Sequence, residues 1–189
     1  MDTAKIEEGV RLLLEGIGED PTREGLVDTP RRVAQMYEDI IATEPKDLSS
    51  LVVAIGSDTH QEMVLVRDIT FHSLCEHHLI PFFGVAHVAY IPSKQGKITG
   101  LSKVVRLVRA AAAQLQLQER LTSTIADTLV KSLEPEGVLV LIKAEHLCLS
   151  MRGVRAPGSR VVTSAVRGIF RTNAATRAEV LALIEAPNK

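Results

Sequence analysis

Hydrophobic residues recur at helical spacing in five stretches of the chain, with polar residues between them. The second stretch begins at Thr29-Pro30, where threonine suits the N-cap and proline suits the first helical position. Ser102 is expected to cap the third stretch, and the third and fourth predict a helical hairpin or one broken helix. The predicted helices cover residues 6–17, a segment from Thr29 to Ile41, two segments between Gly100 and Leu129, and residues 174–184.

Four other stretches are rich in branched and aromatic residues, which favour strands. We expect strands at residues 63–69, 82–91, 138–151 and 161–170, the third of them running through His146 to Met151. Helices and strands stand in separate blocks, which is typical of an α+β domain with an antiparallel sheet. The predicted division is an N-terminal helical region over residues 1–60 and a second domain over residues 61–189.

The composition narrows the choice of partners and compartment. The 189 residues include 22 basic and 23 acidic side chains, so no general electrostatic attraction to nucleic acid or to a membrane surface is expected. No segment approaches the roughly 18 consecutive apolar residues of a membrane span, and the acidic start lacks the features of a signal peptide. The sequence therefore predicts a cytoplasmic protein with neither nucleic acid nor membrane as partner.

The two cysteines, Cys75 and Cys148, each lie near a histidine. A chain of this length needs no disulfide to hold its core, which favours thiol chemistry or metal ligation. His78 follows Cys75 by three positions, and His146 precedes Cys148 by two, a spacing that puts both on one face of the predicted strand. Zinc suits such sulfur and nitrogen ligands. Spacing leaves open a closed four-ligand site, an open three-ligand site, or buried thiols beside unrelated histidines.

Several longer motifs occur in a fixed order between about residues 18 and 170. They are Phe71-His-Ser-Leu-Cys-Glu-His-His-Leu-Ile-Pro-Phe82, Val88-Ala-Tyr-Ile-Pro92, Gly100-Leu-Ser-Lys103, Gln118-Glu-Arg-Leu-Thr122, Met151-Arg-Gly-Val154 and Pro157-Gly-Ser159. Together they resemble the GTP cyclohydrolase I family. The resemblance implies zinc-dependent hydrolysis of GTP to 7,8-dihydroneopterin triphosphate and formate, the first step of tetrahydrofolate and pterin biosynthesis.

The resemblance also implies roles for individual residues. Zinc would be held by Cys75, His78 and Cys148, the open arrangement in which bound water is acidified. His77 and His146 would transfer protons, with His146 as the acid that protonates the purine ring. The predicted substrate-binding residues are Glu119 as the guanine reader, Gln118 beside it, and Ser102, Lys103, Arg106, Arg152 and Arg32 around the triphosphate. By itself, Glu119 would be interpreted as a carboxylate that favours a helix N-terminus.

The family fold is the tunnel fold, an antiparallel four-stranded sheet with two helices on one face, here preceded by N-terminal helices. Residues 61–189 would be its catalytic domain, and the family assembly is a toroidal homodecamer with active sites between subunits. Two alternatives remain. One is the related tunnel-fold nitrile reductase of deazaguanine metabolism, which the paired Cys and His motifs disfavour. The other is a non-enzymatic, zinc-stabilised oligomeric or regulatory module.

Overall fold

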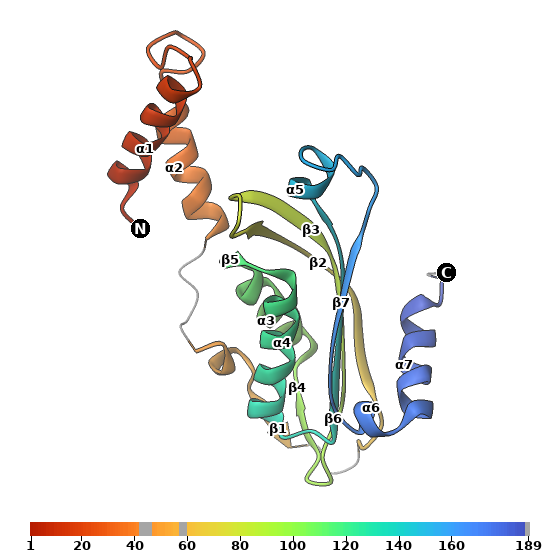
Figure 1. Cartoon of the computed structure of the whole chain (residues 1–189). Helices are drawn as coiled ribbons and strands as arrows, with labels where there is room; N and C mark the ends of the chain where they lie inside the picture. The colour runs from red at the N-terminus through yellow and green to blue at the C-terminus, as the bar shows by residue number, and fades with distance from the viewer. Residues whose placement is uncertain (42–46, 57–59, 188–189) are drawn as a thin grey trace. The chain divides into compact units, whose positions relative to one another are not determined.

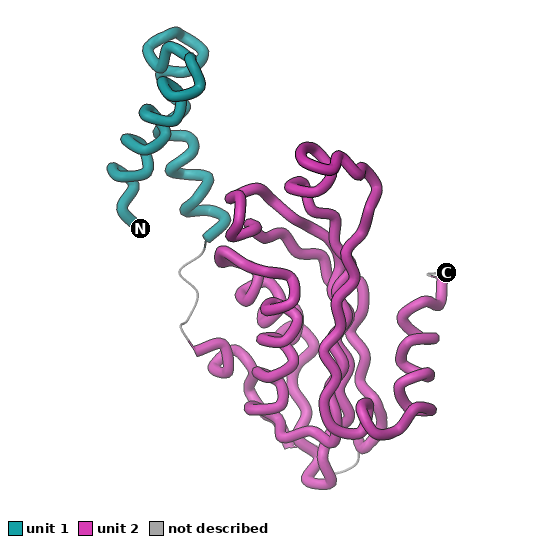
Figure 2. Tube along the Cα trace, in the orientation of Figure 1, with its two compact units in different colours: residues 1–43 teal, residues 44–189 magenta. Residues whose placement is uncertain are grey.

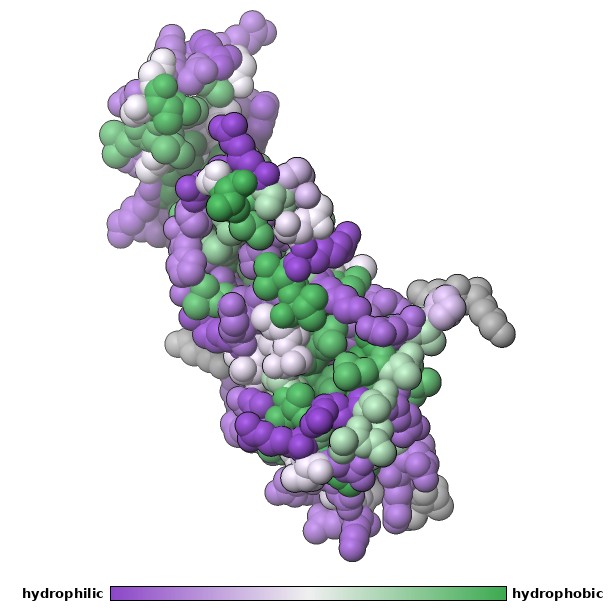
Figure 3. Space-filling view, turned by 45° about the vertical axis from the view of Figure 1, so that its right-hand side comes forward, coloured by the Kyte–Doolittle hydropathy of each residue, from purple (hydrophilic) through white to green (hydrophobic). Residues whose placement is uncertain are grey.

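The computed structural model describes residues 1–41, 47–56 and 60–187 (Figure 1). The chain divides into two compact units, residues 1–43 and 44–189 (Figure 2). The first contains α1 (Thr3–Gly16) and α2 (Thr29–Ile40). Both units expose hydrophobic residues among hydrophilic ones (Figure 3). The boundary differs from the one predicted after residue 60, because Leu48 of the short 3-10 helix η1 (Leu48–Leu51) packs in the core of the second unit.

The second unit is built on an antiparallel sheet. Its four long strands are β2 (Val64–Cys75), β3 (Ile80–Ile91), β6 (Gly137–His146) and β7 (Val161–Gly168), hydrogen-bonded in that order. A two-residue strand, β5 (Leu115–Gln116), pairs in parallel with the end of β2. Two short strands, β1 (Ala54–Gly56) and β4 (Lys97–Thr99), form a separate antiparallel pair.

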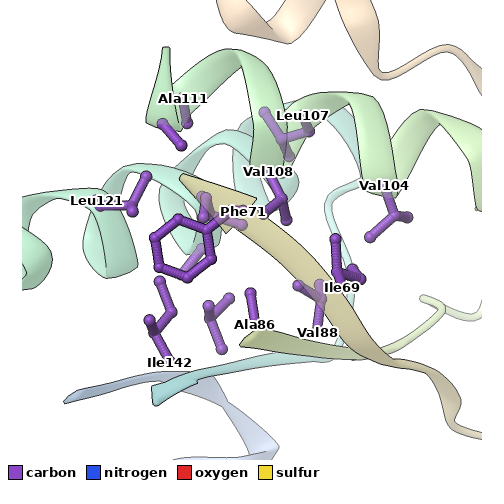
Figure 4. Close-up of a cluster of buried hydrophobic side chains, with 14 of the residues drawn as sticks. Ile69, Phe71, Ala86, Val88, Val104, Leu107, Val108, Ala111, Leu121 and Ile142 are labelled. Atoms are coloured by element: carbon purple, nitrogen blue, oxygen red, sulfur yellow. The ribbon is translucent and has the colours of Figure 1, made fainter. Parts of the chain in front are cut away.

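Two helices cover one face of the sheet, α3 (Leu101–Ala112) and α4 (Gln118–Leu133). Alternate strand residues point to this face, and they meet the helices in the main core (Figure 4). The residues labelled there include Phe71, Ala86, Val88, Leu107, Leu121 and Ile142. The sheet with two helices on one face confirms the predicted α+β tunnel-fold arrangement.

The opposite face carries α6 (Ile169–Thr172) and α7 (Ala174–Glu185). A smaller cluster forms there from Ala89, Leu139, Leu141, Phe170, Val180 and Ile184. Among the helices that the structure describes, none combines the length and hydrophobicity needed to cross a bilayer.

Three local predictions are wrong. The third strand does not continue to Met151, because β6 ends at His146 and the helical turn α5 (Leu147–Ser150) follows. Ser102 is not the N-cap of α3, because the extended residue at that position is Gly100 and the helix already includes Leu101. The helix expected after Thr29 begins at that residue, with Asp28 rather than Thr29 as its N-cap.

Candidate active site

The turn between β2 and β3 brings Cys75 and two histidines to one end of the sheet. The chain reverses over Glu76–Leu79, and the Leu79 N–H donates to the Cys75 carbonyl at 2.8 Å. Leu79 has a φ of 55°, the left-handed conformation that a non-glycine residue adopts at a cost of about 1 kcal/mol or more. The Glu76 N–H donates to the Gln116 carbonyl of β5 at 3.1 Å. Cys75 is thereby buried, while His77 and His78 remain exposed.

The helical turn α5 brings Cys148 to the same place. The ligand atoms of Cys75, His78 and Cys148 all lie within 4.8 Å of one another, and both cysteines are free thiols. Burial raises the pKa of the Cys148 thiol, and the nearby Cys75 sulfur raises it further. Two sulfurs this close together suit a site where a cation holds them as thiolates. Two sulfurs and one imidazole fit zinc, and three ligands leave one position open.

A cavity of about 220 Å³ adjoins this trio. Its walls come from the end of β2 and the turn after it, β5, the start of α4, the end of β6, α5 and the first residue of β7. The lining residues are Cys75, His77, Gln116, Leu117, Gln118, Glu119, His146, Cys148, Leu149 and Val161. Glu119 stands in the first turn of α4, as predicted from the sequence, and it lines the cavity together with His146.

His146 is held on two sides. Its ring stacks on Phe82 with the ring centroids 4.5 Å apart and an interplanar angle of 8°, and its Nε2 lies 2.7 Å from Gln118 Oε1. Burial lowers the pKa of His146 below the usual 6.5, and the opposing effect of Glu119 is smaller. The ring is therefore predominantly neutral at pH 7 in the chain without ligands.

Arg152 follows α5 and approaches the trio from the solvent side. Its Nη1 lies 2.7 Å from His78 Nε2, and because arginine can only donate, His78 Nε2 is the acceptor. A second basic side chain, Arg120, pairs with Glu76 and also donates to Gln116 Oε1 at 3.0 Å. This ion pair links the histidine-bearing turn to the first turn of α4.

The remaining predicted site residues lie elsewhere. The carboxyl end of α3 leads into β5 beside Cys75, whereas Ser102 and Lys103 lie in the first turn of this 12-residue helix and Arg106 lies near its middle. None of the three lines the cavity. Arg32 belongs to the first unit, where it pairs with Asp28 at 3.2 Å. The second unit by itself thus gathers the predicted metal, proton-transfer and guanine-reading residues and one of the phosphate-binding residues.

The family model and the curated relatives agree on one family. The family model described as GTP cyclohydrolase I matches residues 6–185. GTP cyclohydrolase 1 of Geobacillus kaustophilus is 60% identical over 183 residues, which cover 97% of each chain. That of Bacillus subtilis is 58% identical over 177 residues, covering 94% of this chain and 93% of the relative. The solved apo structure of an archaeosine synthase QueF-Like has a TM-score of 0.48 and 18% identity, covering 58% of this chain and 97% of that one.

Proposed function

The chain belongs to the GTP cyclohydrolase I family, and we propose that it hydrolyses GTP to 7,8-dihydroneopterin triphosphate and formate in the cavity beside Cys75. The observation that carries this proposal is that Cys75 and Cys148, two members of the Cys75, His78 and Cys148 trio, line one cavity together with Glu119 and His146. One water is consumed per GTP overall, and C8 of the purine leaves as formate.

We assign zinc to Cys75, His78 and Cys148. Two soft sulfur donors and one imidazole favour zinc over magnesium or calcium, which prefer oxygen ligands. When bound, zinc supplies a Lewis acid that makes water acidic enough to lose a proton near neutral pH. His77 and His146 are not needed to complete the ligand set and are free for proton transfer.

His146 passes a proton to the purine nitrogen next to C8, which makes that carbon more electrophilic. Its fixed position against Phe82 supports this role, because proton transfer requires a donor held within hydrogen-bond reach. The ring must first take up a proton, since burial keeps it neutral at pH 7. His77, on the same cavity wall, is the second proton-transfer group and accepts a proton from the attacking water.

Glu119 reads the guanine base. Its carboxylate is able to accept hydrogen bonds from both the ring N–H and the exocyclic amino group of guanine. Adenine offers neither of these donors in the same arrangement, so it would leave the carboxylate unpaired in the bound state. The exposed position of Glu119 at the cavity leaves it accessible to the base.

The triphosphate is bound by residues of more than one copy of the chain. Arg152 lies beside the metal trio in the same chain, whereas Ser102, Lys103 and Arg106 lie on α3 outside the lining of the cavity and come from a neighbouring copy. We propose the toroidal homodecamer for this assembly. Exposed hydrophobic side chains on both units support it, among them Leu12, Leu13, Ile17, Val162, Leu181 and Leu183 (Figure 3).

The activity is tested by incubating the zinc-loaded protein with GTP. Formate and a pterin that becomes fluorescent after oxidation should appear in equal amounts. ATP at the same concentration is the matched substrate control and should give neither product. If neither product forms from GTP with zinc bound, the proposed reaction is wrong.

The metal assignment is tested by two substitutions on either side of Leu147. Cys148→Ser should abolish turnover and lower the zinc content, because it replaces a thiolate ligand. His146→Ala should abolish turnover while most of the zinc stays bound. Equal zinc loss in both variants, measured by atomic absorption, would favour a closed site in which His146 is a ligand.

Site sharing is tested by mixing two inactive variants. Lys103→Ala and Cys148→Ser should each be inactive alone, and dissociating and reassembling them together should restore part of the activity. Mixing Cys148→Ser with His146→Ala is the control, because both residues lie on the same side of the proposed shared site. Restored activity in the control, or none in the first mixture, would contradict the division of residues between copies.

A further inference from the structure

Gln118 is buried to 1% exposure, although it is the first residue of α4 and adjoins the cavity. Resting on the proposed function, we infer that its side chain does not bind substrate but positions His146, and that Thr163 and Thr122 orient Gln118 for this task. Gln118 is thus a positioning residue, supported by two threonines for which no role is predicted from the sequence.

The orientation of the Gln118 amide follows from its neighbours. Its Nε2 lies 3.2 Å from the Ile142 carbonyl, 3.1 Å from the Val161 carbonyl and 3.0 Å from Thr163 Oγ1. Carbonyl oxygens only accept hydrogen bonds, so the group that faces them must be the amide NH₂. Rotating the amide by half a turn would direct its oxygen at two carbonyl oxygens. Gln118 Oε1 therefore faces His146 as an acceptor.

The hydroxyls of Thr163 and Thr122 allow only one direction for the hydrogen bonds that link them to Gln118. Thr122 Oγ1 donates to the Gln118 backbone carbonyl at 2.6 Å, so it accepts from Thr163 Oγ1, which is also 2.6 Å away. Thr163 Oγ1 then accepts from Gln118 Nε2. The hydrogen bonds form a closed ring from the Gln118 amide through Thr163 and Thr122 to the Gln118 carbonyl. Each hydroxyl has one donor and one acceptor, which favours a single orientation of the amide.

This orientation selects the tautomer of His146. Because Gln118 Oε1 accepts at 2.7 Å, Nε2 of His146 carries the proton. The neutral ring then has its free lone pair on Nδ1, and Nδ1 is the nitrogen that exchanges a proton with the substrate. Phe82 stacks on the ring and holds its plane, while Gln118 decides which nitrogen is protonated. Both constraints act before substrate arrives.

The positioning role and a substrate-binding role for Gln118 predict different kinetics. A residue that reads the base changes the KM for GTP when it is replaced. A residue that acts through His146 changes kcat and leaves GTP binding nearly unchanged. Gln118→Met keeps the length of the side chain and removes both hydrogen-bonding ends. Thr163→Val removes only the hydroxyl, and Thr163→Ser restores it.

We expect Gln118→Met to lower kcat by about 10-fold or more, with the KM for GTP within about twofold of the parent value. Thr163→Val should give a smaller loss of about two- to tenfold, because two carbonyls still hold the amide, and Thr163→Ser should recover it. Zinc content and melting temperature are measured for every variant, so that a folding defect is recognised. A large rise in KM with unchanged kcat for Gln118→Met would overturn the inference.

A spectroscopic measurement tests the tautomer without relying on turnover. We would record the ¹⁵N spectrum of zinc-loaded protein containing ¹⁵N-histidine. The signals of His146 are those absent from the spectrum of His146→Asn. They should show a proton on Nε2 in the parent and a mixture of tautomers in Gln118→Met. The same tautomer mixture in both proteins would refute the inference. If the parent shows the Nε2–H form but does not turn over GTP, the proposed function fails while the positioning of His146 stands.

Discussion

Replacing Phe82 by leucine is expected both to destabilise the protein and to slow its reaction. The ring is fully buried, stacks on His146, and meets the ring of Phe71 edge to face with centroids 5.9 Å apart at 75°. Each aromatic pair contributes about 0.5–1.5 kcal/mol beyond the area that it buries. Losing two pairs and part of the ring volume should lower the free energy of unfolding by about 2–4 kcal/mol.

Phe71→Leu is the matched control. Phe71 is 2% exposed and contacts the edge of Phe82, but it lies on β2 and points into the main core (Figure 4). Its replacement loses one aromatic pair, so the expected destabilisation is smaller, about 1–2 kcal/mol. Melting temperatures at a fixed protein concentration measure both effects, at about 2–4 °C per kcal/mol for a chain of this size.

The two variants should differ in activity. Phe82→Leu frees one side of the His146 ring, so kcat should fall by about 10-fold, whereas Phe71→Leu should keep kcat within about twofold of the parent. Steady-state assays with GTP well below both melting temperatures make the comparison. The stacking contact would have no role in the reaction if Phe82→Leu lost stability but kept the parent kcat. A similar loss of kcat in both variants would instead indicate a general loosening of the core.

Three other substitutions test separate parts of the structure. Glu119→Gln should lower kcat/KM for GTP by about 10- to 100-fold, because a charge-assisted hydrogen bond is lost. The ratio of kcat/KM for GTP to kcat/KM for ITP, which lacks the amino group, should also fall. An unchanged ratio would contradict the proposal that Glu119 reads guanine. Arg152→Met should raise zinc affinity about two- to tenfold in a chelator competition without GTP. When Nε2 of a neutral His78 ring accepts from Arg152, Nδ1 carries the proton, so neither nitrogen is available to a metal until this hydrogen bond breaks. Weaker zinc binding in the variant would contradict this. His87→Asn should flatten the pH dependence of stability. Burial lowers the pKa of His87 below 6.5, so the unfolded chain binds more protons than the folded one. The contribution of His87 to the free energy of unfolding is therefore complete above about pH 6.5 and is lost as the pH falls, at up to about 1.4 kcal/mol per pH unit. If urea titrations between about pH 5 and 7 give the same slope of this free energy against pH in both proteins, the reasoning is refuted.

The strands were predictable where hydrophobic alternation is regular. The predicted segment 82–91 agrees with β3, which begins two residues earlier. The segment 63–69 was too short, because β2 continues to Cys75. A register shift between Val66 and Ile69 places Asp68 in a left-handed conformation, and the inward positions follow a new phase from Ile69 onward. An irregularity of this kind disrupts the period of two on which the prediction depended.

The site was predictable as a set of residue types but not as a set of contacts. The sequence pairs Cys75 with His78 and His146 with Cys148; both cysteines and His146 line one cavity, and His78 lies beside the two sulfurs. The reason given for the second pair was wrong, since Cys148 lies on a helical turn and not on the strand of His146. The stacking of Phe82 on His146 depends on which residues of β3 and β6 face each other, and no local pattern encodes that register.

The register of β3 couples the two halves of the site. Its first residues pair with Cys75 on one side, while Phe82 pairs with His146 on the other. A slip of one residue would turn Phe82 to the opposite face and separate it from His146. Gly84 favours the observed register, because a Cβ at this position would lie only 2.0 Å from the Lys143 carbonyl. Close approach of β3 to β6 at this glycine therefore helps to hold the cysteine-bearing turn and His146 around one cavity, so the geometry of the candidate site depends on a residue that has no side chain.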